Sequence, residues 1–204
     1  MILALLLTTL TFKVPGMDCA GCAKPVTQTL SSLPGVTNVH VDWKAKSASI
    51  DVPSDFDRNA LRKAMLNAGY EVQFAGEKRP ELEPVPAEVL KMLDIATFDG
   101  KKPIDFKSIP ASGKITIVDF YADWCGPCKV LELRLQHFMQ GKKIALRRIN
   151  VGKWDNAAAK QATRDFKMPG LPYLRVYDAH GKFVAAIENG MWDELLETIE
   201  GIPQ

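Results

Sequence analysis

The pattern of apolar and polar positions in the first part of the chain predicts a small domain of strands and helices. Residues 9–14 alternate as a strand does and stop at Pro15-Gly16, and a helical spacing of apolar residues follows at about 22–33. The remaining predicted elements are strands at 36–42 and 45–52, a helix at 57–69 and a strand at 70–74. The order β-α-β-β-α-β is the split βαβ pattern of ferredoxin-like folds.

The second part of the chain follows a different pattern. Residues 115–121 (ITIVDFY) form a nearly continuous apolar run, as expected for a central strand buried on both faces. The remaining predicted elements are a helix at 125–139, a strand at 144–151, an Ala-rich helix at 156–166, hairpin strands at 173–177 and 183–187, and a helix at 191–200. Strands that alternate with helices and end in a hairpin predict an α/β sandwich.

A change in composition separates these two patterns. Residues 77–86 (EKRPELEPVP) combine charges with three prolines, which is typical of a semi-rigid linker. We therefore predict a first domain at 8–76, a linker at 77–93 and a second domain at 94–204. Before them, the apolar run 1–7 (MILALLL) is either a lead-in to the first strand or the remnant of an export signal.

Overall composition excludes some classes of partner. Of the 204 residues, 47% are hydrophobic and 25% are charged, and the net charge is +2, as in ordinary globular proteins. Lys and Arg are spread along both halves rather than clustered on one segment, so we expect no nucleic-acid partner. No apolar run approaches the roughly 20 residues that a membrane-spanning helix needs.

The four cysteines carry the main chemical signal. They form two Cys-x-x-Cys pairs, Cys19/Cys22 and Cys125/Cys128. A disulfide within either pair would close so short a loop that it would restrain the unfolded chain very little. The spacing therefore favours metal binding or redox chemistry over a structural role.

The second pair follows the predicted strand 115–121 and opens the predicted helix. Unpaired backbone N–H groups at a helix N-terminus stabilise a thiolate, which lowers the pKa of Cys125 from about 8.5 toward about 7. Cys128, one turn further along, can then attack the sulfur of Cys125 and resolve a mixed disulfide. The neighbouring Trp124 is expected on a substrate-facing surface, whereas Trp43, Trp154 and Trp192 are predicted to be packing residues.

Residues 118–129 (VDFYADWCGPCK) resemble the thioredoxin family, and the resemblance extends over about 94–204. It implies a thioredoxin fold that reduces protein disulfides and is itself reduced by a thiol system. It also implies that Asp119 is the buried acid that relays a proton for the resolving cysteine. An Asp inside an apolar strand is otherwise hard to justify, because burying it unpaired is costly. Pro172 matches the cis-proline that faces the active cysteines.

This stretch departs from the family at several positions. Tyr121 stands where a Trp is common, and Leu133 replaces the proline that usually kinks the active-site helix. Arg148 falls at the position of the family's lysine near the buried acid, where it keeps a positive charge but cannot shuttle protons. The alternatives for Cys125/Cys128 are half of a zinc site or an inert disulfide.

The first pair lies in residues 16–22 (GMDCAGC), in the loop after the first strand. Two thiolates at a loop-to-helix junction can hold a soft cation such as Cu(I) in near-linear geometry. The stretch 10–75 resembles the heavy-metal-associated domains of copper chaperones, metal-transporting ATPases and periplasmic mercury-binding proteins. This resemblance implies that Met17 packs beneath the metal loop and that Tyr70 lies close to it.

The residue before Cys19 leaves the identity of the metal at the first pair undecided. Asp18 stands where copper-binding members often have Thr, and a carboxylate is a hard ligand that favours divalent ions such as Zn(II), Cd(II) or Pb(II). We expect Cys19, Cys22 and Asp18 to bind monovalent copper, or alternatively Zn, Cd or Hg, and we expect no organic cofactor. The alternatives are a second redox disulfide, or a docking domain without metal.

Together the motifs predict a thiol–disulfide oxidoreductase that is coupled to a soft-metal-binding domain and reduces metal-binding cysteines of itself or of a partner. The alternative is a copper or zinc chaperone that uses the second domain for docking, and a third possibility is metal binding by Cys125/Cys128 as well. Expected partners are proteins with disulfides, a thiol reductant system, and a metal-transporting ATPase or metallochaperone. For the compartment, the cell envelope is slightly favoured over the cytoplasm.

Overall fold

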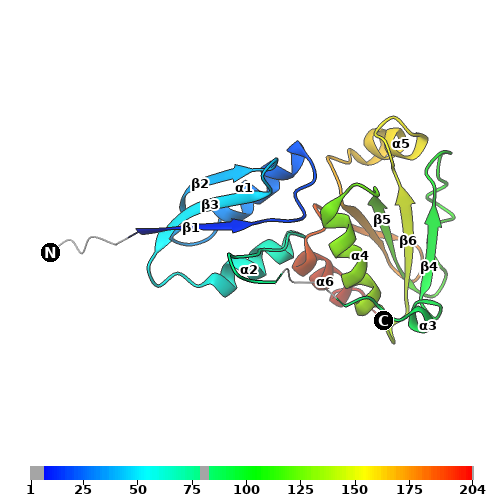
Figure 1. Cartoon of the computed structure of the whole chain (residues 1–204). Coiled ribbons are helices and arrows are strands. Elements are labelled where there is room, and N and C mark those ends of the chain that lie inside the picture. The colour runs from blue at the N-terminus through cyan, green and yellow to red at the C-terminus, as the bar shows by residue number, and fades with distance from the viewer. Residues whose placement is uncertain (1–6, 79–82, 204) are drawn as a thin grey trace. The chain divides into compact units, whose positions relative to one another are not determined.

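The computed structural model of the chain describes residues 7–78 and 83–203, which belong to two compact units (Figure 1). The first unit ends at Glu81 and the second begins at Leu82. Of the apolar run 1–7, only Leu7 lies within the described residues. None of the described helices has the length and apolar composition needed to cross a bilayer.

The first unit contains a three-stranded antiparallel sheet with the strand order β1-β3-β2. Its elements are β1 (Leu7–Lys13), the short 3-10 helix η1 (Ala20–Cys22), α1 (Ala23–Ser31), β2 (Thr37–Asp42), β3 (Ser47–Pro53) and α2 (Arg58–Asn67). In β3, every second residue is buried, because one face of the sheet is covered by the core. This is the predicted ferredoxin-like arrangement, apart from its last strand.

The strand predicted at 70–74 is reduced to a single bridge between Lys13 and Gln73. At this bridge Lys13 and Gln73 exchange both backbone hydrogen bonds, so the backbone groups of the neighbouring Val72 and Phe74 point away from β1 and meet side chains instead. Nη1 of Arg62 donates to the carbonyl of Val72 at 2.8 Å, and the Phe74 N–H donates to Oε2 of Glu77 at 3.0 Å. The segment therefore still packs its apolar side chains, but it pairs with β1 at one position.

The second unit is a mixed five-stranded sheet with the order β4-β6-β5-β7-β8. Its elements are α3 (Ala87–Leu90), β4 (Asp94–Phe98), β5 (Ile115–Tyr121), α4 (Gly126–Phe138), β6 (Ile144–Asn150), α5 (Ala157–Phe166), β7 (Tyr173–Tyr177), β8 (Phe183–Glu188) and α6 (Trp192–Glu200). β4 and β5 run parallel to β6, whereas β7 is antiparallel to β5 and β8 to β7.

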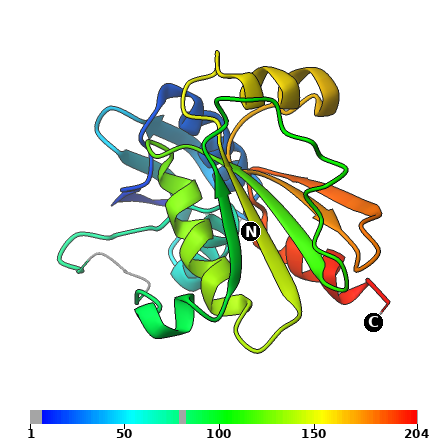
Figure 2. The same ribbon diagram turned by 90° about the vertical axis from the view of Figure 1, so that its right-hand side faces the viewer.

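Helices cover both faces of this sheet, as Figures 1 and 2 show. On one face, Leu131 and Leu135 of α4 and Leu195 of α6 pack in one cluster with residues of the sheet. On the other face, Ala-rich α5 packs against Val118 and Phe120 of β5. The predicted α/β sandwich is therefore confirmed.

Two elements of the second unit were not predicted from the sequence. The four-residue helix α3 lies within the predicted linker 77–93, and it is too short to display a helical period. The edge strand β4 is half-buried along most of its length, so it lacks the alternation of a one-sided strand. By contrast β5 lies between β6 and β7 and is buried almost throughout, which explains its continuous apolar run.

Candidate functional site

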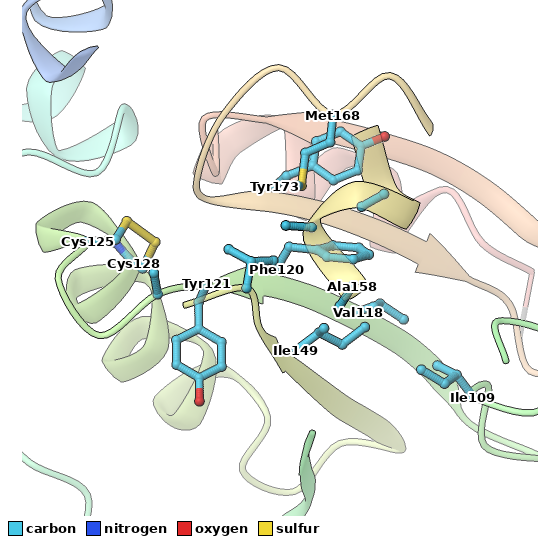
Figure 3. Packing of buried hydrophobic residues seen from close by; sticks show 14 of the residues in the cluster. Ile109, Val118, Phe120, Tyr121, Cys125, Cys128, Ile149, Ala158, Met168 and Tyr173 are labelled. Atoms are coloured by element: carbon cyan, nitrogen blue, oxygen red, sulfur yellow. A yellow bond between two sulfur atoms is a disulfide. The ribbon is translucent and has the colours of Figure 1, made fainter. Parts of the chain in front are cut away.

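Cys125 and Cys128 lie where β5 leads into α4, and they form a disulfide (Figure 3). Cys125 is the N-cap of α4, with extended backbone angles, and its Sγ accepts a hydrogen bond from the Cys128 N–H at 3.3 Å. Pro127 occupies the first turn, where a missing N–H costs nothing. The first cysteine thus lies at the positive end of the helix dipole, which stabilises a thiolate there once the disulfide is reduced.

The loop before Cys125 is held by two hydrogen bonds to the end of β6 and the loop that follows it. Nε1 of Trp124 donates to the carbonyl of Gly152 at 2.7 Å, and Nδ2 of Asn150 donates to Oδ2 of Asp123 at 3.2 Å. Trp124 is still 42% exposed, whereas Cys125 is 4% exposed and Cys128 is 1% exposed. A partner that reaches the disulfide from this side therefore meets the Trp124 ring first.

Trp154 corrects one expectation from the sequence. It was predicted to pack, but it is 47% exposed in the loop between β6 and α5. The loop that Trp124 binds through Gly152 therefore carries a second exposed indole.

Pro172 precedes β7, and its peptide bond with Leu171 is cis, in agreement with the resemblance. A residue that sequence reasoning missed lies against it. Gly190, between β8 and α6, approaches the Pro172 ring and the side chain of Leu131 in α4. The available signal was the Asn189-Gly190 pair, which is typical of a turn that needs positive φ.

Asp119 is fully buried in the middle of β5. Its Oδ2 accepts a hydrogen bond from Nε of Arg148 at 3.1 Å, and its Oδ1 has no partner among the described residues. Burial raises the pKa of Asp119 to about 6, although the charge and hydrogen bond of Arg148 oppose the rise. The acid in the apolar run is therefore poised to bind and release a proton near neutral pH.

Arg148 joins Asp119 to a residue that was not predicted. Nη1 of Arg148 contacts Oε1 of Glu132 at 2.5 Å, and its guanidinium carbon lies 3.8 Å from the centre of the Tyr121 ring. Glu132 lies one turn after Cys128 in α4. The resemblance already placed Arg148 near Asp119, and β6 pairs these two residues, but the contact with Glu132 is visible only in the structure.

In the first unit, Cys19 and Cys22 are free thiols with their sulfur atoms 2.6 Å apart; Cys19 is the N-cap of η1 and Cys22 is its last residue. Burial, together with the hydrogen bond and charge of Cys22, raises the pKa of Cys19 to about 11. Met17 is fully buried in the same loop. The hydroxyl of buried Tyr70 lies within hydrogen-bonding reach of Cys22, and burial raises the pKa of that tyrosine.

Asp18 does not join the two thiols. Its carboxylate forms an ion pair with Nζ of Lys46, which also reaches the carbonyl of Pro15 at 3.4 Å. In the part of the chain that the structure describes, no group of three His, Cys, Asp or Glu residues is placed to hold a metal ion. Asp18 as a third ligand therefore stays a prediction, and in this structure the nearby Lys46 ammonium holds its carboxylate.

The remaining donor set fits a soft cation. Two thiols alone suit a metal that accepts low coordination with sulfur, whereas Zn(II) normally requires four ligands. Cys19 and Cys22 are therefore the residues of this unit that would hold the metal.

Comparison with known proteins assigns a family to each unit. The model of the Heavy-metal-associated domain matches residues 11–71, and that of Thioredoxin matches residues 101–201. The thioredoxin of Coprinus comatus is 34% identical over 73 residues, which cover 36% of this chain and 67% of that protein. Thioredoxin H2 of Arabidopsis thaliana is 30% identical over 113 residues, which cover 55% of this chain and 78% of that protein.

Among solved structures, oxidized MerP from Ralstonia metallidurans CH34 is 30% identical, with a TM-score of 0.33, and covers 34% of this chain and 99% of MerP. The matches place the Cys19/Cys22 pair in one family region and the Cys125/Cys128 pair in the other. The chain belongs to the thioredoxin family of disulfide oxidoreductases, with a heavy-metal-associated domain ahead of its thioredoxin domain.

Proposed function

We propose that Cys125 and Cys128 reduce disulfides formed by metal-binding cysteines, and that Cys19 and Cys22 of the same chain are among their substrates. The observation that carries this proposal is the pairing of two chemistries in one chain. One Cys-x-x-Cys pair forms a disulfide at a helix N-terminus, and the other is a pair of free thiols in a metal loop. A Cys19–Cys22 disulfide would have no thiolates to offer a metal.

The proposed reaction begins with the reduced form of the second pair. The Cys125 thiolate attacks one sulfur of the substrate disulfide, forms a mixed disulfide and releases the other substrate sulfur as a thiolate. Cys128 loses its proton to Asp119, and its sulfur attacks Sγ of Cys125. The substrate then leaves as a dithiol and the Cys125–Cys128 disulfide remains, so two electrons have moved to the substrate. An external dithiol reductant restores the starting state.

Three further residues support this proposed cycle. Trp124 presents an exposed ring beside Cys125 on the approach to the disulfide. Pro172 precedes β7, the strand paired with β5, and we assign it to binding the substrate backbone. Asp119 supplies a buried carboxylate with one oxygen that has no partner among the described residues and can take a proton.

The proposed metal is monovalent copper, held by Cys19 and Cys22, with Hg(II), Cd(II) or Zn(II) as alternatives. A two-thiolate site without the Asp18 carboxylate favours the softer ions. The proposed partners are a metal-transporting ATPase or metallochaperone that exchanges metal with this pair, and proteins whose metal-binding cysteines have become oxidised. Because the two pairs share one chain, the second acts on the first at high effective concentration.

The test measures how fast an oxidised metal loop regains its thiols. The full chain is oxidised at both pairs, mixed with a limiting dithiol reductant, and followed by Cu(I) uptake. Wild type is expected to recover faster than the Cys125→Ser variant, at a rate independent of protein concentration. Equal rates in the two proteins would contradict reduction of Cys19–Cys22 by the second pair.

A second function, metal delivery with the thioredoxin domain as a docking platform, is favoured by the deep burial of the disulfide. Insulin reduction separates the two functions. The Cys19→Ser/Cys22→Ser full chain keeps the second pair and should reduce insulin in the presence of dithiothreitol if the domain is a working reductase. No turnover above the dithiothreitol background would favour docking.

A further inference from the structure

One guanidinium in the second unit, that of Arg148, binds two carboxylates from different elements. Arg148 of β6 donates through Nε to Asp119 in β5 and contacts Glu132 of α4 through Nη1. Its guanidinium carbon also lies over the Tyr121 ring. The guanidinium is therefore fixed on three sides, and its single positive charge is shared between two acids.

The charge balance of this group decides which acid holds a proton. With both carboxylates ionised, Asp119, Arg148 and Glu132 carry a net negative charge in a largely buried place, which is costly. Glu132 keeps 31% of its side chain exposed, whereas that of Asp119 is fully buried and its Oδ1 has no described partner. Burial therefore favours the protonated form of Asp119.

We propose that Glu132 is a positioning residue that holds Arg148 by its own charge and so leaves Asp119 free to exchange a proton with Cys128. This inference rests on the proposed function, because it assigns a role to Asp119 in the same cycle. Cys128 and Glu132 are four residues apart in α4 and so share a helix face. In the step itself, Cys128 gives its proton to Asp119 as its sulfur bonds to Sγ of Cys125, the bond between Cys125 and the substrate sulfur breaks, and that sulfur leaves as a thiolate.

The other groups around Asp119 do not replace Glu132 in this role. The charged groups that act on Asp119 are Arg148, which favours its anion, and Glu132, which disfavours it. Tyr121 is the last residue of β5, and Asp123 lies in the loop between β5 and α4. On the neighbouring strand β7, the residue paired with Asp119 is the apolar Leu174. Without Glu132, Asp119 would be left as the only carboxylate among the described residues in contact with Arg148.

The experiment titrates the Asp119 carboxyl carbon by NMR in the oxidised full chain, with Asp119→Asn used to assign the signal. In Glu132→Gln, the titration midpoint should fall by about one pH unit, because a like charge is lost and Arg148 acts on Asp119 alone. Glu132→Asp should restore part of the wild-type midpoint. Glu200→Gln, an exposed change at the end of α6, should leave it unaltered. An unchanged or raised midpoint in Glu132→Gln would overturn the inference.

A second measurement, the pH dependence of the reduction rate, separates this inference from the proposed function. The pH profile for insulin reduction should shift to lower pH in Glu132→Gln, and the shift should vanish in the Asp119→Asn background. If wild type reduces no disulfide at any pH, the proposed function fails, while the NMR midpoint still decides the role of Glu132. If wild type is active but Glu132→Gln gives the same profile, only the inference fails.

Discussion

Gly190 and Pro172 lie so close together that a side chain at position 190 would meet the proline ring. An added Cβ would be 2.8 Å from Cγ of Pro172 and 3.0 Å from Cδ2 of Leu131. The backbone of Gly190 also has φ of +61°, a conformation that favours glycine. The absence of a side chain here therefore lets the turn after β8 lie against both the proline before β7 and helix α4.

Replacing Gly190 by Ala should destabilise the second unit and lower its reductase activity. The expected loss is about 1–3 kcal/mol in the free energy of unfolding, from backbone strain together with the displaced ring. Urea denaturation measures it. Gly113→Ala is the matched control, because Gly113 also has positive φ but has open space around it, and it should cost about 1 kcal/mol. Equal losses in both variants would show that the contact with Pro172 contributes nothing.

Asp119 should make the stability of the oxidised protein depend on pH. Its folded pKa of about 6 lies above the ordinary value of 3.8, so the folded state binds the proton more tightly than the unfolded state. The stabilisation from this group is complete below pH 3.8 and is lost as the pH rises through 6, by at most about 3 kcal/mol.

Asp119→Asn should remove this dependence. Other carboxyls with lowered pKa values, such as Asp94, change stability in the opposite direction, so the informative quantity is the difference between variant and wild type. Denaturation at several pH values from 4 to 7 measures that difference. A difference that stays constant over this range would be inconsistent with a buried acid that titrates near 6.

The metal loop should bind a soft cation through its two cysteines alone. In a full chain that carries Cys125→Ser and Cys128→Ser, Cys22→Ser should weaken Cu(I) binding by about 100-fold or more, because one of two ligands is lost. Asp18→Asn should change the affinity by less than about threefold, since its carboxylate pairs with Lys46. Competition with a chromophoric Cu(I) chelator measures both, and a comparable loss in the two variants would make Asp18 a ligand.

The hydrogen bond of the Trp124 indole should contribute to the approach of substrates. Trp124→Phe keeps an exposed ring but loses the donor to Gly152, so the loop before Cys125 is held less firmly. We expect kcat/KM for insulin reduction to fall about two- to tenfold. Trp154→Phe is the control, because this exposed indole has no hydrogen bond to the residues that the structure describes, and the variant should retain wild-type kcat/KM.

The sequence predicts best where a local pattern determines the outcome. The run 115–121 is a strand with these bounds, because a strand between two neighbours must be apolar on both faces. Motif spacing likewise placed Cys125 at the N-cap of α4. The family resemblance identified the acid at position 119, and physical chemistry supports it, since an ionisable residue inside a buried strand needs a function or a partner.

Contacts between distant segments could not be read from the same patterns. Glu132 looks like an ordinary polar residue of a helix until β6 brings Arg148 beside it. Asp18 has the right residue type and spacing for a metal ligand, yet Lys46, 28 positions away, holds it. The strand predicted at 70–74 has the expected apolar residues, but among the described residues it pairs with β1 only at the Lys13–Gln73 bridge.

The shortened last strand has a consequence for how the first unit behaves at high concentration. β1 pairs with β3 along one side, and on the other side the described residues pair with it only through the Lys13–Gln73 bridge. An edge with unpaired backbone groups can accept a strand from another chain, which is a common start of aggregation. Lys13 lies at one end of this edge, where its charge opposes pairing with a strand of another chain. The part of β1 toward Leu7 is therefore the segment most prone to self-association.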